Sequence, residues 1–311
     1  MLSRVADTIY WLARYMERTQ SMLQVIRTSY VASQNELMEY SWSPLLHAYG
    51  DLTDEEITAI ECNTQKALHH LILDKNNGAS AYTNVLRGRE NARAVQDHIT
   101  KEVWQALNDY YHVMQNPEVS QQIRRGDPIS GIEMIMRNSL IFTGCVKNTM
   151  ARDEGYVYLH LGKYLERALQ TVDTLRIRWA AISRDEHHPL ESSGLRYLLY
   201  SLFGYELYMK TYKGNFNPTN VLHLVMYNTH FPHSLLYSLQ QMDQYFQRLQ
   251  PVSLPESYER LSFLLGRTKN NVKYNVFTAE NPEALIAFLL QVREELLEIA
   301  SAFDQYYFGN S

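Results

Sequence analysis

Glutamate and arginine stand side by side in two stretches of the chain that match each other. Each stretch has a basic residue, a glutamate and an arginine at positions i, i+3 and i+4, and the second follows the first by 149 positions. A glutamate can act as a general acid or base, and an arginine can orient a carboxylate or phosphate. The same side chains can instead form helical ion pairs worth about 0.2–0.5 kcal/mol each. Both interpretations stay open for these candidate site residues: Arg14, Glu17, Arg18, Lys163, Glu166 and Arg167.

A second charged cluster lies between the two stretches. Arg89 and Arg93 lie one turn apart on one face of a predicted helix, where two arginines can clamp a phosphate or carboxylate. They can also pair with Glu17 or Glu166 on another helix, and this internal pairing is the favoured interpretation. If the two halves of the chain pack about a two-fold axis, the Glu-Arg pairs meet at the centre, as structural ties or as a binding site. The candidate residues of this cluster are Arg89, Glu90, Asn91, Arg93 and Asp97.

A third charged group, formed by Arg152, Asp153 and Glu154, comes directly before the second stretch. Asp153 is placed to cap the helix that follows, because its carboxylate can accept hydrogen bonds from the first free backbone amides. This capping role is favoured over ligand binding, and all three residues remain candidates for the polar site.

Motifs for metal, cofactor or nucleophile chemistry do not occur in the sequence. The chain has 11 histidines but no Glu-x-x-His pair and no His-Glu-x-x-His. It also lacks a Walker loop, a Gly-x-Gly-x-x-Gly turn and a Gly-x-Ser-x-Gly elbow. We therefore expect no metal and no cofactor, while the sequence does not decide whether the chain is an enzyme.

The elements that must position these residues are helices. Apolar residues in steps of three and four place both Glu-Arg stretches on long helices, and further single helices are predicted over 54–73 and 194–212, among others. The chain has only 13 glycines and 9 prolines, so few turns interrupt it. We predict an all-α, multi-helix bundle of roughly nine to eleven helices, built from two related halves that start near residues 1 and 150. No linker-like segment separates the halves, so residues 1–311 are expected to form a single domain.

Composition limits the partners of the chain. The formal net charge is −5, and acidic and basic residues are mixed along the sequence. This balance gives no general attraction to nucleic acid or to an anionic membrane. No uncharged stretch approaches the ~18–20 residues of a membrane-spanning helix, and no signal-peptide pattern is present. The only cysteines, Cys62 and Cys145, fit reduced thiols. We therefore expect a cytoplasmic protein without a nucleic-acid or membrane partner.

Four motifs give the chain a specific family resemblance. They are Met1–Arg18; Arg89–Asp97 with Glu102, Trp104 and Asn108; Thr149–Gly155 with Leu161–Arg167; and Tyr205–Tyr212 with Pro218 and Phe231–Ser234. Their order and spacing resemble the bacterial alpha-E domain family over almost the whole chain. Two sites depart from the family pattern. His233 stands where an arginine is usual, and Val225–Asn228, including Met226, stands where an acidic Leu-Leu-Asp-type segment is usual.

The resemblance implies an all-α fold and a role beside other proteins. Members of this family occur next to, or fused with, a circularly permuted ATP-grasp protein, and transglutaminase-like peptidases are common neighbours. ATP-grasp enzymes join amines to carboxylates through acyl phosphates. The implied role is a helical binding or scaffold component of a bacterial peptide or amide-bond-forming modification system, with an ATP-grasp ligase as its partner and a transglutaminase-like peptidase as a second candidate partner. The chain would hold a peptide, a carrier or the ATP-grasp partner in a groove lined by tyrosines and the arginine clusters.

Two other functions remain as alternatives. In the first, Glu17 and Glu166 are the acid and base of a catalytic subunit, and the arginine cluster orients a carboxylate or phosphate substrate. In the second, the chain is a structural homo-oligomer whose polar seam sets the register of its helices.

Overall fold

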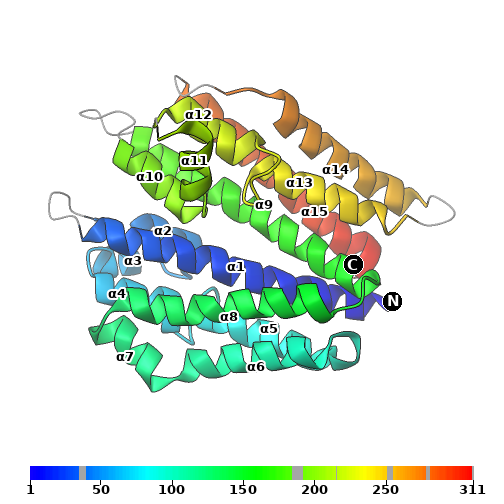
Figure 1. The fold of residues 1–311 in the computed structure, drawn as a ribbon, viewed down its shortest axis with the longest axis horizontal. Coiled ribbons are helices and arrows are strands. Elements are labelled where there is room, and N and C mark those ends of the chain that lie inside the picture. Colours follow the sequence, from blue (N-terminus) through cyan, green and yellow to red (C-terminus); the bar gives the residue numbers. More distant parts are fainter. Residues whose placement is uncertain (35–39, 184–191, 215, 251–254, 278–280, 310–311) are drawn as a thin grey trace. The chain divides into compact units, whose positions relative to one another are not determined.

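The computed structural model of the chain describes residues 1–34, 40–183, 192–214, 216–250, 255–277 and 281–309. Within these ranges every regular element is a helix and none is a strand (Figure 1). The prediction of an all-α fold is therefore confirmed. In the part of the chain that the structure describes, no helix is both long and apolar enough to cross a membrane.

The helix count differs from the prediction. The described ranges contain 15 α-helices, so the expected number of roughly nine to eleven was wrong. The predicted helix over 54–73 is divided, because the Asn63 side chain accepts a hydrogen bond from the Lys66 amide at 3.0 Å and starts a new helix. The predicted helix over 194–212 is also divided. It ends before Phe203, whose φ of 58° lies in the left-handed region.

Two further helices were not predicted at all. They are α2 (Ser43–Tyr49) and α7 (Pro117–Arg125), and both have a proline in the first turn. Proline has no backbone amide to leave unpaired there, and its fixed φ suits the start of a helix. These short helices carry too few apolar residues for their periodicity to stand out in the sequence.

The described helices group into two compact units, and α1 (Ser3–Ser33) contributes to both. Unit 1 consists of Met1–Tyr10 and Asp153–Ser311, and unit 2 consists of Trp11–Arg152. The boundary therefore falls inside a continuous helix at one side and at the turn before α9 at the other.

Unit 2 is a stack of helices whose starts are set by capping side chains. Helix α6 packs against α5, α7 and α8, and α7 also packs against α8. The side chains of Ser80, Thr100, Asn116 and Asp127 accept backbone hydrogen bonds at the starts of α5, α6, α7 and α8. After α1 and α2 the elements of unit 2 are α3 (Asp54–Ile60), α4 (Thr64–Leu68), the π-helix η1 (His69–Leu73), α5 (Ala81–Ala94), η2 (Gln96–His98), α6 (Lys101–Gln115), α7 and α8 (Pro128–Thr149).

Unit 1 is built around the long helix α9, which packs against α13 and α15. Its core is aromatic. The ring of Tyr10 lies 5.6 Å from that of Phe303 and 5.1 Å from that of Phe308. The elements of unit 1 after the start of α1 are α9 (Glu154–Ser183), α10 (Ser192–Ser201), α11 (Tyr205–Tyr212), α12 (Pro218–Leu222), the π-helix η3 (His223–Tyr227), α13 (Leu235–Gln247), α14 (Glu256–Tyr274), α15 (Pro282–Phe303) and the π-helix η4 (Asp304–Phe308).

Glycine permits a close approach between two helices in each unit. In unit 1, a Cβ added to Gly162 of α9 would lie 2.3 Å from the backbone oxygen of Tyr10. In unit 2, a Cβ added to Gly88 of α5 would lie 2.4 Å from the terminal methyl of Met16. The first contact is with backbone and the second with the end of a flexible side chain, so only the first is rigid.

Candidate functional site

The predicted arginines of α5 form a compact group that we call the Arg89 cluster, made of Arg89, Glu90, Arg93, Trp104, Asn108 and Tyr111. Arg89 donates from Nε to Asn108 Oδ1 at 2.9 Å and from Nη1 to Glu90 Oε1 at 2.8 Å. Its guanidinium carbon lies 4.8 Å from the centroid of the Tyr111 ring and 5.5 Å from that of Trp104. The α6 helix thus supplies both rings and one hydrogen-bond acceptor, and it holds Arg89 in one orientation.

Glu90 pairs with both arginines of the cluster. Its second carboxylate oxygen lies 3.4 Å from Arg93 Nη1, and Arg93 is largely exposed. Two arginines and one glutamate leave the group with a net positive charge. Within unit 2 both arginines thus pair with a neighbour on their own helix, and the expected pairing with Glu17 or Glu166 on another helix stays a prediction. Of the two other predicted residues of this segment, Asn91 is half-buried on α5 and Asp97 is exposed in η2.

The first Glu-Arg stretch lies on the part of α1 that belongs to unit 2. Arg14 and Glu17 are buried, with 5% and 3% of their surface exposed, and Arg18 is half-buried. The guanidinium of Arg14 lies 4.2 Å from the centroid of the Trp11 ring. Both buried charges therefore depend on polar or aromatic neighbours for their stability, and neither lies on a solvated helix face.

The second Glu-Arg stretch lies on α9 in unit 1. Glu166 is buried and accepts a hydrogen bond from Gln170 Nε2 at 3.1 Å. Arg167 donates to the backbone oxygen of Pro232 at 3.1 Å, and its guanidinium lies 5.5 Å from the Tyr164 ring. Burial raises the pKa of the Tyr164 hydroxyl. Arg167 therefore ties α9 to the turn before α13. Because Glu17 and Glu166 belong to different units, the expectation that the two pairs meet at one centre stays a prediction.

The residues before α9 close helix ends. Asp153 accepts a hydrogen bond from the Tyr156 amide at 3.1 Å, which confirms its capping role. Arg152 donates to the backbone oxygen of Met150 at 2.7 Å and to that of Lys147, the last turn of α8. Basic side chains at the carboxyl end of a helix satisfy carbonyls that have no intrahelical partner.

His233, one of the two departures from the family pattern, lies in the turn before α13. Its ring centroid is 4.9 Å from that of Phe203, and its backbone oxygen accepts a hydrogen bond from Thr171 at 3.2 Å. Burial, assisted by the charges of Arg167 and Lys163, lowers the pKa of His233 well below its ordinary value. The imidazole is therefore neutral at pH 7, so this position lacks the positive charge of the usual arginine.

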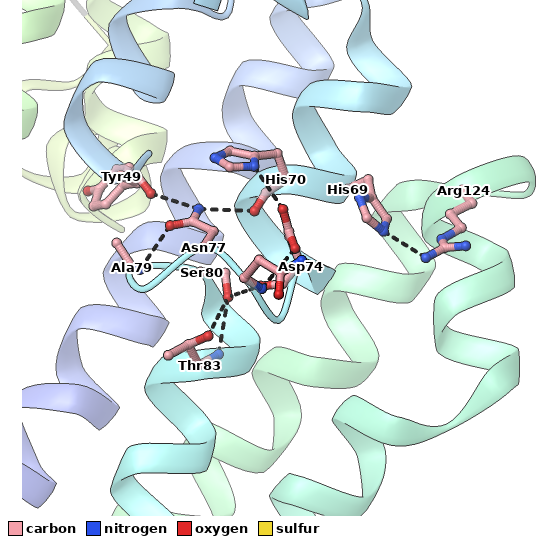
Figure 2. A network of polar contacts seen from close by, with 10 residues as sticks. Tyr49, His69, His70, Asp74, Asn77, Ala79, Ser80, Thr83 and Arg124 are labelled. Carbon is pink, nitrogen blue, oxygen red and sulfur yellow. Dashed lines mark hydrogen bonds and ion pairs between the residues drawn. The ribbon is translucent and has the colours of Figure 1, made fainter. Parts of the chain in front are cut away.

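Sequence reasoning missed a polar network at the turn between η1 and α5 (Figure 2). Asp74 lies 3.0 Å from His70 Nδ1, and its backbone oxygen accepts from the Ser80 hydroxyl at 2.7 Å. Ser80 in turn accepts from the Thr83 amide at 3.1 Å and caps α5. Asn77 donates to the backbone oxygens of Tyr49 and His70 at 3.0 and 3.1 Å. Buried polar groups that are satisfied in this way fix one conformation of the turn.

The same turn occurs in unit 1, between η3 and α13. Asn228 Oδ1 accepts from the His230 amide at 2.8 Å, and the Asn228 backbone oxygen accepts from the Ser234 hydroxyl at 2.6 Å. Ser234 accepts from the Tyr237 amide at 3.0 Å and caps α13. In both units the spacing is Asn-x5-His-x4-Asp/Asn-x5-Ser, 154 positions apart. A search for repeated polar spacings would have found this signal.

Residues 1–308 match the sequence model of the Alpha-E family, described as a predicted alpha-helical domain with a conserved ER motif. The chain belongs to the Alpha-E family. Glu17-Arg18 and Glu166-Arg167 are two of its Glu-Arg dipeptides, and Glu259-Arg260 is a third.

Curated relatives of this Alpha-E chain are uncharacterised mycobacterial proteins. One from Mycobacterium bovis and one from Mycobacterium tuberculosis strain CDC 1551 are each 23% identical over 261 residues, and one from strain H37Rv is 22% identical. The match covers 77% of this chain but 29% of each relative, so the chain spans less than a third of their length. No solved structure matches. Among the residues that the structure describes, no group of three potential ligands is placed to hold a metal ion.

Proposed function

We propose that this chain is the helical binding component of a bacterial system that makes or modifies peptide or amide bonds, and that it holds a carboxylate-bearing peptide for an ATP-grasp ligase. The observation that carries the proposal is the fixed position of Arg89. Its Nε and Nη1 are held by Asn108 and Glu90, while Nη2 donates to no other described residue. An arginine that is already oriented loses little conformational freedom when it binds a carboxylate.

The surroundings of Arg89 support a peptide rather than a bare ion. Tyr111 and Trp104 offer aromatic faces to a neighbouring side chain or peptide plane, and Gln115 donates to Tyr111 Oη at 2.7 Å. The hydrogen bond from Gln115 limits rotation of the Tyr111 hydroxyl. A free carboxylate at Arg89 with a peptide chain across these rings would use both features.

The partnership with an ATP-grasp ligase follows from the family resemblance. The length of the curated relatives is compatible with such a partnership, because more than two thirds of each relative lies outside the match. A helical unit that is joined to, or works beside, other segments fits a binding role better than a solitary one. The repeated turn at Ser80 and Ser234 likewise supports the proposal that the two units are related halves.

The test uses the purified full chain and an ATP-grasp ligase of the proposed system. Co-elution in size-exclusion chromatography and a change in ATP turnover are expected for the wild-type pair. Arg89→Gln is expected to co-elute but to lose at least tenfold of the stimulated turnover, because a charge-assisted hydrogen bond is removed. Arg137→Gln on α8 is the matched control, since Arg137 is exposed and lies outside the Arg89 cluster.

Two outcomes would overturn the proposal. Absence of both co-elution and any effect on turnover would remove the binding role. Loss of turnover in Glu17→Gln or Glu166→Gln, with Arg89→Gln unaffected, would favour the catalytic alternative instead.

A further inference from the structure

Unit 2 contains an open hollow of about 700 Å³ beside α4, within the size range of small-molecule sites. We call it the α4 hollow. Helix α3 and the segment before it contribute apolar groups to its lining, including Leu52, Ala59 and Ile60. Helices α4 and α7 contribute three cations, Lys66, Arg124 and Arg125. The lining of the hollow therefore combines apolar and basic groups.

The cations of the α4 hollow have no acidic partner among the described residues. Two carboxylates also line the hollow, but both are engaged elsewhere. Glu56 accepts hydrogen bonds from the amide and hydroxyl of Thr53 at 2.8 and 3.2 Å in a capping box. Asp74 accepts from the Asn76 amide at 2.9 Å and lies beside His70. Three cations and two carboxylates leave the lining with a net positive charge, and neither carboxylate forms an ion pair with Lys66, Arg124 or Arg125.

Arg124 is oriented by a histidine from η1. Its Nη2 lies 2.7 Å from His69 Nε2, as Figure 2 shows. Arginine can only donate, so His69 Nε2 is the acceptor and the imidazole proton is on Nδ1. Burial and the charge of Arg124 lower the pKa of His69, which keeps the ring neutral and able to accept at pH 7. The remaining guanidinium nitrogens are left for another acceptor.

The equivalent turn in unit 1 forms without the charge of Lys66. At the matching positions, 154 residues later, Asn220 replaces Lys66 and Leu224 replaces His70. In unit 1, His223 Nδ1 lies 3.0 Å from the Tyr212 hydroxyl. Its counterpart in unit 2, His69, contacts Arg124 instead. The π-helix and its serine cap form in both units. The charge of Lys66 is therefore not required by the architecture of the turn.

We propose that the α4 hollow binds a small molecule that carries an oxyanion, a carboxylate or a phosphate, next to an apolar group. The oxyanion lies against Lys66, Arg124 and Arg125, and the apolar group lies against the wall formed by Leu52 and Ile60. Arginine suits both oxyanions because its planar fork can donate two parallel hydrogen bonds. This site is separate from the Arg89 cluster and does not depend on the proposed function.

The experiment titrates the full chain with hexanoate, hexyl phosphate, hexanamide and inorganic phosphate, followed by ligand-observed NMR and calorimetry. At least one of the two amphipathic anions is expected to bind saturably, and the stronger of the two identifies the oxyanion. Hexanamide and inorganic phosphate are each expected to bind at least tenfold more weakly, because one lacks the charge and the other the apolar group. Arg124→Gln and Lys66→Gln are each expected to weaken binding about tenfold.

The matched controls are Arg137→Gln and Lys101→Gln, which remove exposed cations of the same unit outside the hollow. Both are expected to bind as the wild type does. Circular dichroism is used to check that all four variants are folded. They are expected to fold, since the replaced side chains are exposed. The proposal is overturned if neither amphipathic anion binds, or if Arg124→Gln and Lys66→Gln bind as tightly as the controls.

Discussion

Gly162→Ala tests whether the contact between α9 and the start of α1 is as close as the structure indicates. The added Cβ would lie 2.3 Å from the Tyr10 backbone oxygen and 3.0 Å from its carbonyl carbon. Ordinary contacts between heavy atoms lie at about 3.5–4.0 Å, so one helix must shift by roughly an ångström. Rotation of a side chain cannot relieve this clash, because the two atoms nearest the added Cβ belong to the backbone of Tyr10.

The expected size of the effect is a difference between two terms. Alanine in place of glycine inside a helix gains about 1 kcal/mol of helix propensity. Overpacking against a rigid neighbour costs typically 1–3 kcal/mol, and a backbone contact lies at the upper end of that range. The free energy of unfolding is therefore expected to fall by about 2 kcal/mol.

Gly88→Ala is the matched control. Its Cβ would meet the Met16 methyl at 2.4 Å, but methionine has three rotatable bonds and can move aside. Gain and loss should then cancel to within about 1 kcal/mol. Urea unfolding followed by circular dichroism gives both values from the shift in midpoint at constant slope. A midpoint for Gly162→Ala at or above that of the wild type would refute the backbone contact.

Three further predictions concern single positions. His233→Gln should lose less stability between pH 7 and pH 5 than the wild type. Because the pKa of His233 is lowered in the folded chain, the neutral imidazole contributes fully to the free energy of unfolding above its ordinary pKa of about 6.5. Below that pH the contribution decreases by at most about 1.4 kcal/mol per pH unit. Melting temperatures at both pH values check this, and equal losses would contradict it. Ser80→Ala and Ser234→Ala should each cost about 2 kcal/mol in urea unfolding, because each removes a helix cap and the hydroxyl that donates to a half-buried carbonyl. A loss under about 0.5 kcal/mol would show that water replaces the hydroxyl. Gly144→Ala and Gly266→Ala, whose new Cβ atoms would meet nothing within 4 Å, should each raise stability by about 0.5–1 kcal/mol, and a lower melting temperature would count against this.

The sequence was sufficient for features that depend on local periodicity. The apolar steps around Glu17 and Glu166 predicted two long helices, and α1 and α9 are the longest elements described. The placement of Asp153 before an apolar run predicted its cap correctly, because capping involves only a few neighbouring residues. In both cases the residues that produce the structure lie within one or two helical turns of one another in the sequence.

Features that depend on distant contacts were not predictable in the same way. Periodicity placed Arg89 on a helix but could not show that Asn108 and Tyr111 of the next helix hold it. The contact of His69 with Arg124 joins positions far apart in the chain, and α7, which carries Arg124, was not predicted. The π-helices change only the hydrogen-bonding step of the backbone, so composition gives no sign of them.

The division of α1 between the units affects how the chain folds during synthesis. Trp11–Arg152 is one continuous stretch and can assemble while the ribosome is still making the rest. Residues 1–10 cannot follow the same schedule, because the ring of Tyr10 packs on Phe303 and Phe308, which are synthesised much later. Their apolar side chains stay uncovered until α15 and η4 have been made, so this segment waits far longer for its packing partners than Trp11–Arg152 does.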